Sequence, residues 1–246
     1  MIDTHAHLDA CADPPDELVR RAREAGVGRI LTVGTTIERC RTALELADGY
    51  PEVFAILGIH PHEASDDHDL DALRDLLAHP RAVAVGETGL DFFRDYAPHD
   101  RQRALFRQLL ELAGELGKPV VIHNRAADEA VLEELASFDG TVVLHCFSYP
   151  LALPAALERG YYVSFAGNAT YKNASDLRLA ATQVPLERLL TETDAPYLSP
   201  EPLRGRPNEP AHVVHTLAAL ARTRGDDPEE LAAQVDKNAA RAFGLP

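Results

Sequence analysis

The sequence has few cysteines and no long apolar run. Its three cysteines, Cys11, Cys40 and Cys146, form no CxxC pair, so they do not indicate a disulfide framework and instead fit a reducing cytoplasm. A chain of 246 residues can bury enough apolar surface to fold without such cross-links. The longest stretch without Asp, Glu, Lys or Arg, residues 140–157, contains a histidine and two prolines, which argues against a transmembrane helix.

The N-terminus lacks the basic and apolar regions of a signal peptide, because Asp3 and His5 stand in their place. We therefore expect a cytoplasmic protein that is not associated with a membrane. Positive charge is also scarce, since 39 acidic residues face 24 basic ones and the net charge is −15. A protein that coats nucleic acid normally carries a basic stripe, and this sequence has none. A nucleic-acid substrate would have to be attracted by bound cations and a few local basic residues, at an end or a loop.

Short apolar runs alternate eight times with amphipathic segments. The runs are rich in Val, Ile and Leu and are bounded by Gly or Pro, which is typical of strands buried on both faces. The expected strands cover residues 2–8, 29–34, 53–59, 82–87, 120–123, 141–145, 161–165 and 189–192. The clearest helix is predicted over residues 100–116, and two more over 211–224 and 228–243 follow the last strand.

Strands that alternate with helices form parallel βαβ units, and eight such units favour a closed barrel over an open doubly wound sheet. The length of the chain also matches a minimal barrel of this kind. The sequence therefore predicts the α/β class and a TIM-type (β/α)₈ barrel, with residues 1–246 as a single domain.

Histidine and carboxylate side chains gather at the carboxyl ends of these strands, where barrel enzymes place their sites. The first strand ends in His5-Ala6-His7, and side chains two positions apart on a strand point the same way. Both imidazoles should therefore face the mouth of the barrel. The later strands add four candidates: Glu87, His123, His145 and Asp194. A single histidine at a strand end is usually structural, but the convergence of all six side chains favours metal binding.

Six such ligands suit two divalent ions better than one. A bridging carboxylate can hold two ions roughly 3.5–4 Å apart, which polarise the substrate oxygen and lower the pKa of a bound water. We assign the bridge to Glu87, and we expect Asp194 both to bind an ion and to orient or deprotonate the attacking water. Imidazole ligands favour Zn²⁺ or Mn²⁺, whereas Mg²⁺ prefers oxygen. Mn²⁺ or Zn²⁺ should bind most tightly, with Mg²⁺ still able to support turnover.

A second group of cationic and donor side chains follows the same strand ends. Arginine binds phosphate oxygens with a fork of donors, and lysine binds them as a point charge. We predict that the substrate is bound by His60, His62, Arg125, Lys172, Arg206 and Asn208. A single loop arginine is most often a solvated surface charge, so this prediction depends on the common position of the group.

Three long motifs, in order, resemble those of the TatD-type metal-dependent deoxyribonucleases. They are IDTHAHLD at residues 2–9, PVVIHNR at residues 119–125 and LLTETDAP at residues 189–196. The resemblance extends from residue 2 to the C-terminal helices. It implies two ligand sets that share Glu87, with His5, His7 and Asp194 on one ion and His123 and His145 on the other.

The resemblance implies hydrolysis of DNA phosphodiesters by a hydroxide that two divalent ions activate. The expected activity is that of a 3'-5' exonuclease, an abasic-site endonuclease or both, with a role in DNA repair. Single-stranded or damaged DNA would be a transient substrate, and no obligate protein partner is expected. The alternative is an esterase that acts on D-aminoacyl-tRNA, as some family members do. A non-catalytic scaffold would have lost ligands, whereas this chain keeps all six.

The sequence departs from the family pattern at one place. After His145-Cys146-Phe147-Ser148 the family usually continues with glycine, whereas this chain has Tyr149-Pro150. Proline stiffens the loop after the sixth strand. Because every ligand remains in place, the departure bears on substrate range more than on activity.

Overall fold

Eight parallel strands form one sheet in chain order, in a computed structural model that describes residues 1–246. The strands are β1 (Ile2–Ala6), β2 (Arg29–Gly34), β3 (Val53–Leu57), β4 (Ala82–Asp91), β5 (Val120–Arg125), β6 (Val142–Leu144), β7 (Tyr162–Phe165) and β8 (Leu189–Thr191). A bridge between Ala6 and Ala195 returns the last strand to the first, and the backbone N–H of His7 donates to the carbonyl of Ala195 at 2.7 Å. The predicted TIM-type barrel is confirmed.

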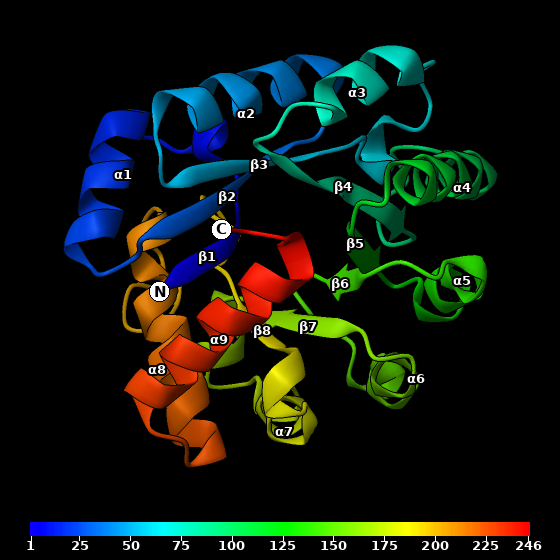
Figure 1. Ribbon diagram of the computed structural model, residues 1–246. Coiled ribbons are helices and arrows are strands. Elements are labelled where there is room, and N and C mark those ends of the chain that lie inside the picture. The colour runs from blue at the N-terminus through cyan, green and yellow to red at the C-terminus, as the bar shows by residue number, and fades with distance from the viewer.

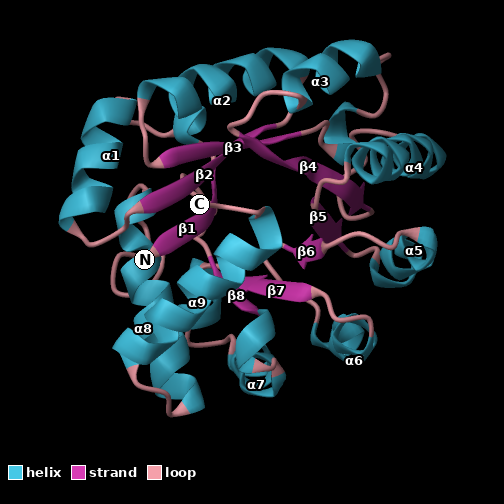
Figure 2. Ribbon diagram, viewed as in Figure 1, coloured by secondary structure: helices cyan, strands magenta, loops and turns pink.

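Helices surround the strands, as Figures 1 and 2 show. They are α1 (Pro15–Glu24), α2 (Ile37–Gly49), α3 (Leu70–Leu77), α4 (His99–Leu116), α5 (Asp128–Glu134), α6 (Leu153–Glu158), α7 (Ser175–Gln183), α8 (Val213–Arg224) and α9 (Pro228–Phe243). Gly117 ends α4 in the left-handed conformation that glycine adopts without strain. The helix predicted over 228–243 matches α9, whereas the one predicted over 211–224 begins with a short 3₁₀ turn before α8. No helix combines the length and apolar character needed to cross a membrane.

The strands are buried on both faces, because the inner face fills the barrel and the outer face packs against helices. Every residue of β1, β3 and β4 is buried, polar residues included. Phe106 of α4 and Ile56 of β3 are among the largest side chains that are wholly enclosed. Polar groups inside such a core need hydrogen bonds or ligands, so the buried His and Glu side chains at the strand ends require an explanation.

An ion-pair cluster fastens α5 to α4 on the outside of the barrel. Arg103 Nε and Arg107 Nε each lie 2.6 Å from an oxygen of the buried Glu134 carboxylate. Burial alone would raise the pKa of Glu134, but hydrogen bonds from the two guanidinium groups lower it below its usual value. The carboxylate is therefore ionised at neutral pH.

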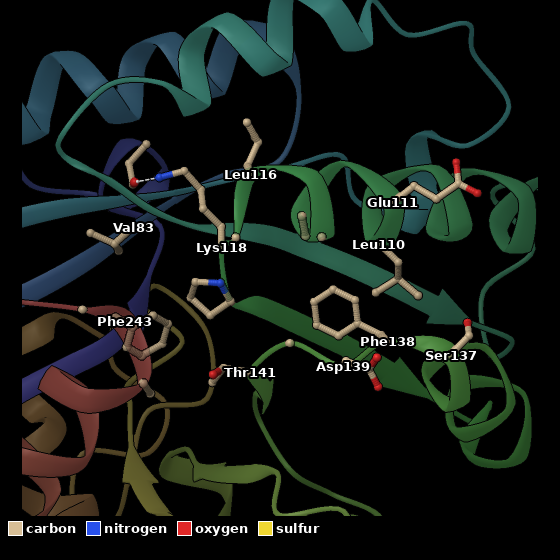
Figure 3. Close-up of a pocket in the computed structure, with 18 of the residues that line it drawn as sticks. Val83, Leu110, Glu111, Leu116, Lys118, Ser137, Phe138, Asp139, Thr141 and Phe243 are labelled. Carbon is tan, nitrogen blue, oxygen red and sulfur yellow. Dashed lines mark hydrogen bonds between the residues drawn. The ribbon is translucent and has the colours of Figure 1, made fainter.

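The amino end of the barrel is covered by α9, which lies close to β8 and β1 in Figure 1. Asn238 of α9 donates to the carbonyl of Leu189, the first residue of β8, at 2.8 Å. A hollow of about 1070 Å³ remains beside the starts of β4 and β5 (Figure 3). There the Lys118 ammonium donates to the Ala82 carbonyl at 2.6 Å, and none of the histidine and carboxylate groups that could hold a metal ion lies in this hollow.

Strand pairing slips at two places that carry candidate ligands. The register of β1 with β2 shifts within residues 3–6, and that of β4 with β5 shifts within residues 85–88. An irregularity of this kind bends the strand and re-aims a side chain, and such features are common beside active sites. The two shifted segments contain His5 and Glu87.

Candidate metal centre at the barrel mouth

The six predicted ligands lie together at the carboxyl end of the barrel. Each has a side-chain nitrogen or oxygen within 4 Å of such an atom in another member of the group. His5, His7, Glu87 and His145 are buried, and His123 and Asp194 are partly buried at the wall of the mouth. Parallel strands bring these residues together although they span most of the chain.

Glu87 stands at the centre of the cluster, and its two oxygens face different partners. Oε2 lies 3.4 Å from His5 Nε2 and 3.7 Å from His7 Nε2. Oε1 lies 2.6 Å from His123 Nδ1 and 2.8 Å from His145 Nε2. The carboxylate thus lies between two groups of imidazoles, with one oxygen toward each.

Asp194 completes the first of these groups. Its Oδ1 lies 3.6 Å from His7 Nε2 and 3.9 Å from His5 Nε2. The residue follows β8 in the left-handed conformation, at φ 55°, and its backbone N–H donates to the carbonyl of His5 at 2.9 Å. This hydrogen bond lies beside the bridge that closes the barrel, and it fixes the position of the Asp194 backbone against β1.

The charges of the cluster favour ionised carboxylates. Burial would raise the pKa of Glu87, but the charge of His145 and the hydrogen bonds from His123 and His145 hold it well below its usual range. Burial also acts to raise the pKa of Asp194, and the imidazoles, His7 first, lower it overall. Ionised carboxylates beside imidazoles are the donor set of a divalent-ion site.

The buried imidazoles also have nitrogen atoms without partners. Neither ring nitrogen of His5 makes a hydrogen bond, and neither does Nε2 of His123, although all three atoms are shielded from solvent. Leaving such groups unpaired costs free energy unless a ligand takes their lone pairs. The cluster contains three groups of residues, and within each group the potential ligand atoms all lie within 4.8 Å of one another. The groups are His5, Glu87 and His145; His5, His7 and Asp194; and His60, Glu87 and His123. The residues present therefore fit bound metal.

A buried carboxylate that the sequence analysis did not single out supports His145 from behind. Glu192 Oε1 lies 3.1 Å from His145 Nδ1 and accepts the backbone N–H of Cys146 at 2.8 Å. A carboxylate in this position fixes the orientation of a ligating imidazole and raises its basicity. Its position at the end of β8 is the same signal that identified Asp194, so the sequence offered a way to find it.

Asp91, the last residue of β4, plays a similar part on the other side of the cluster. Its Oδ2 lies 2.7 Å from His62 Nε2 and 3.4 Å from His123 Nε2. Burial would raise its pKa, but the nearby His123 ring and the hydrogen bonds from His62 and the backbone lower it. Oδ1 accepts the backbone N–H groups of Phe93 and Arg94 at 2.9 and 3.0 Å. Asp91 therefore couples the cluster to the loop that follows β4.

Three of the predicted substrate-binding residues, His60, His62 and Arg125, line a cavity of about 770 Å³ above the cluster. His60 also lies within the cluster itself, with Nε2 3.5 Å from Glu87 Oε1 and 3.3 Å from His123 Nδ1. Burial lowers the pKa of His60 to about 4, so its ring is neutral at pH 7 and has a lone pair to offer.

The other three predicted substrate-binding residues have different surroundings. Lys172 and Arg206 are exposed and do not line the cavity. Asn208 is buried, and its amide donates to the carbonyls of Thr193 and Tyr197. Asn208 thus holds the segment that carries Asp194, while a contact with substrate stays a prediction for all three residues.

The departure from the family pattern at Tyr149 also affects the mouth of the barrel. Tyr149 lines the cavity, and its hydroxyl oxygen accepts the backbone N–H of Ala126 at 2.9 Å. This bond ties the loop after β6 to the loop after β5, directly beside Arg125. A glycine at this position would provide no such tie.

Known proteins resemble this chain over nearly its whole length. Residues 2–244 match the family described as TatD related DNase. A Mycobacterium tuberculosis protein named "Uncharacterized metal-dependent hydrolase TatD" is 42% identical over 260 residues, which cover 100% of this chain and 98% of that protein. A Salmonella typhimurium protein named "3'-5' ssDNA/RNA exonuclease TatD" is 39% identical over 257 residues, which cover 99% of this chain and 98% of that protein.

A solved structure supports the same assignment. The crystal structure of YJJV, a TatD homologue from Escherichia coli, matches with a TM-score of 0.93 at 33% identity and covers 100% of this chain and 98% of that one. The resemblance inferred from the three sequence motifs is confirmed. The chain belongs to the TatD related DNase family and is a metal-dependent hydrolase.

Proposed function

We propose that this hydrolase cleaves phosphodiester bonds at the ends of single-stranded nucleic acid, as a 3'-5' exonuclease that binds two divalent ions. The position of Glu87 carries the proposal, because its two oxygens face separate groups of imidazoles. A carboxylate placed in this way suits a pair of ions of the kind that serves phosphodiester hydrolysis. The relatives from Salmonella typhimurium and Citrobacter rodentium, both named 3'-5' ssDNA/RNA exonuclease, support the choice of substrate.

We assign two ligand sets as the family resemblance implies them. His5, His7 and Asp194 would hold one ion and His123 and His145 the other, with Glu87 shared. When bound, the ions polarise a phosphate oxygen and lower the pKa of water. We expect Mn²⁺ or Zn²⁺ to bind most tightly, because most of the ligands are imidazoles, and Mg²⁺ to support turnover.

The remaining chemistry belongs to side chains at the wall of the mouth. Asp194 is ionised, its Oδ1 faces the imidazoles, and 13% of its side chain is exposed toward the cavity. Its second oxygen therefore serves as the acceptor for a proton from the attacking water. The Arg125 guanidinium lines the same cavity and supplies the donors that hold a phosphate oxygen in place.

The test uses metal-free protein reloaded separately with Mg²⁺, Mn²⁺ and Zn²⁺. Single-stranded DNA labelled at the 5' end and a D-aminoacyl-tRNA are given in parallel to the wild type, Glu87→Ala and Asp194→Asn. We expect a ladder of shortened 5'-labelled products in the wild type and none in either variant. Glu187→Gln, which removes an exposed charge before β8, is the matched control and should behave as the wild type.

Other outcomes would overturn the proposal in recognisable ways. Intact DNA together with rapid deacylation of the tRNA would move the reaction from phosphorus to a carbonyl carbon, which is the esterase alternative. Cleavage only at abasic sites within a duplex would replace the exonuclease with an endonuclease. Binding of a single ion at saturation would contradict the shared role of Glu87.

A further inference from the structure

Exposed aromatic side chains are confined to the mouth of this barrel. The chain has eight phenylalanines, seven tyrosines and no tryptophan. Only Phe93, Tyr96 and Tyr197 are exposed, by 61%, 60% and 56%. Large aromatic rings that are exposed to solvent in one region of the surface indicate a binding site.

The two tyrosines stand on opposite sides of the metal cluster, and both line the 770 Å³ cavity. The Tyr96 ring meets the His62 ring edge to face, with centroids 4.7 Å apart. The Tyr197 ring meets the His7 ring in the same manner, with centroids 6.0 Å apart. His7 lies toward Glu87 Oε2, whereas His62 contacts His60, which lies toward Glu87 Oε1. Tyr197 and Tyr96 therefore flank the bridging carboxylate.

Cationic side chains lie beside these rings. Arg94 and Arg125 line the cavity, and the Arg125 guanidinium sits 4.2 Å from the centroid of the Phe93 ring. Asp91 fixes this arrangement, because it accepts the backbone N–H groups of Phe93 and Arg94. Aromatic rings that stack with bases and cations that follow the backbone are the shared composition of sites for single-stranded nucleic acid.

The same features disfavour a protein partner. An interface core between proteins is depleted of charge, whereas most of the residues that line this cavity are polar or charged, histidines and carboxylates of the cluster among them. A base presents a flat π-face to an exposed ring, and its phosphate carries the negative charge that arginines and bound cations attract.

We propose that Tyr96 and Tyr197 each stack on one unpaired base of a single strand, so that the scissile phosphate lies between them over Glu87. The proposal rests on the phosphodiesterase activity proposed above and assigns the preference for single strands to two residues. Bases within a duplex are stacked on one another and do not offer their faces to the tyrosines. Stacking accepts every base, so cleavage shows little sequence preference.

The experiment compares Tyr96→Ala and Tyr197→Ala with the wild type, in Mn²⁺-loaded protein. Each is given a single-stranded oligonucleotide, the same oligonucleotide with abasic residues on both sides of the scissile bond, and bis(p-nitrophenyl) phosphate. Tyr96→Phe and Tyr197→Phe keep the ring and should restore binding. Leu179→Ala removes an exposed apolar side chain of α7, away from the cavity, and is the matched control.

We expect each Tyr→Ala variant to raise KM for the oligonucleotide about 5- to 150-fold, which corresponds to one lost base stack. The kcat on the oligonucleotide and the rate on the small diester should change little. On the abasic oligonucleotide the penalty should vanish, because the wild type has no base to stack there either.

The results separate the two proposals. A wild type that cleaves neither the oligonucleotide nor the small diester refutes the phosphodiesterase itself. A wild type that cleaves both, with KM unchanged in the Tyr→Ala variants, refutes stacking alone. A penalty that persists on the abasic oligonucleotide or on the small diester gives the tyrosines a structural role and also refutes stacking.

Discussion

Substitution of Glu192 by glutamine isolates the effect of the carboxylate behind His145. Glu192 is fully buried, and Oε1 serves both the Cys146 backbone N–H and His145 Nδ1. Glutamine retains the shape and one acceptor oxygen but loses the negative charge. With its oxygen in the place of Oε1, its NH₂ group occupies the place of Oε2, which has no hydrogen-bond partner in the wild type.

The magnitude follows from this exchange. In the metal-free protein the charges of Glu87 and Glu192 act against burial and raise the pKa of His145, so the substitution removes one of two carboxylates paired with its ring and should lower the unfolding free energy by about 1–3 kcal/mol. The loss of metal affinity is a separate effect. Removal of an outer carboxylate from a ligating histidine costs about 10- to 100-fold in affinity, or about 1.4–2.8 kcal/mol.

The assay is titration of metal-free protein with Mn²⁺ by calorimetry, together with melting curves in chelator. The matched control is Glu187→Gln, since it makes the same chemical change at an exposed position before β8. Glu192→Gln should lower the Mn²⁺ affinity, while its melting curve in chelator stays cooperative at a moderately lower melting temperature, which shows that the variant is folded.

An unchanged Mn²⁺ affinity in a well-folded Glu192→Gln protein would refute the reasoning, because His145 would then be oriented without the carboxylate. An equal loss in Glu187→Gln would refute it as well, since a general charge effect would explain the result.

Three further predictions concern the frame around the site. Gly89→Ala should destabilise the fold by about 3 kcal/mol and abolish activity, because Gly89 has a φ of 138° and an added Cβ would lie 2.0 Å from the carbonyl oxygen of His123. Gly114→Ala on α4 is the control, since its Cβ would meet no other atom, and it should raise the free energy of unfolding in urea by about 0.5–1 kcal/mol. Glu134→Gln should lower the free energy of unfolding by about 1 kcal/mol at neutral pH. Because the pKa of this carboxyl is lowered on folding, the difference from the wild type should be full above about pH 5 and shrink as acid protonates the wild type, and urea titrations at several pH values measure it. Tyr149→Phe should lower the unfolding free energy by about 0.5–1 kcal/mol through loss of the loop tie, and an unaltered urea midpoint would contradict that role.

The strands were predictable because burial on both faces leaves an unbroken apolar signature. The start of β2 and the end of α9 agree to the residue with expectation. The fourth strand was predicted to end at residue 87, yet β4 continues to Asp91. The register shifts beside Glu87, but pairing with β5 resumes at Thr88.

The cluster was predictable because a barrel brings the carboxyl ends of all its strands to one mouth. The roles of the residues beside the cluster depend on the direction in which each side chain points, which the sequence position does not reveal. Glu192 and Asp194 lie two residues apart, yet the first supports His145 from behind and the second faces His5 and His7. The loops are harder still, since the exposure of Tyr96 depends on how the segment after β4 folds back against His62.

The closure of the barrel has a consequence for synthesis of the protein. His5 and His7 leave the ribosome long before Asp194 and the Ala195 carbonyl that pairs with His7, because nearly 190 residues separate them in the chain. Long-range pairing of this kind forms late, because distant segments must first meet. The histidine and carboxylate cluster at the mouth of the barrel therefore stays incomplete in a nascent chain until β8 and the segment that follows it have been made and have paired with β1.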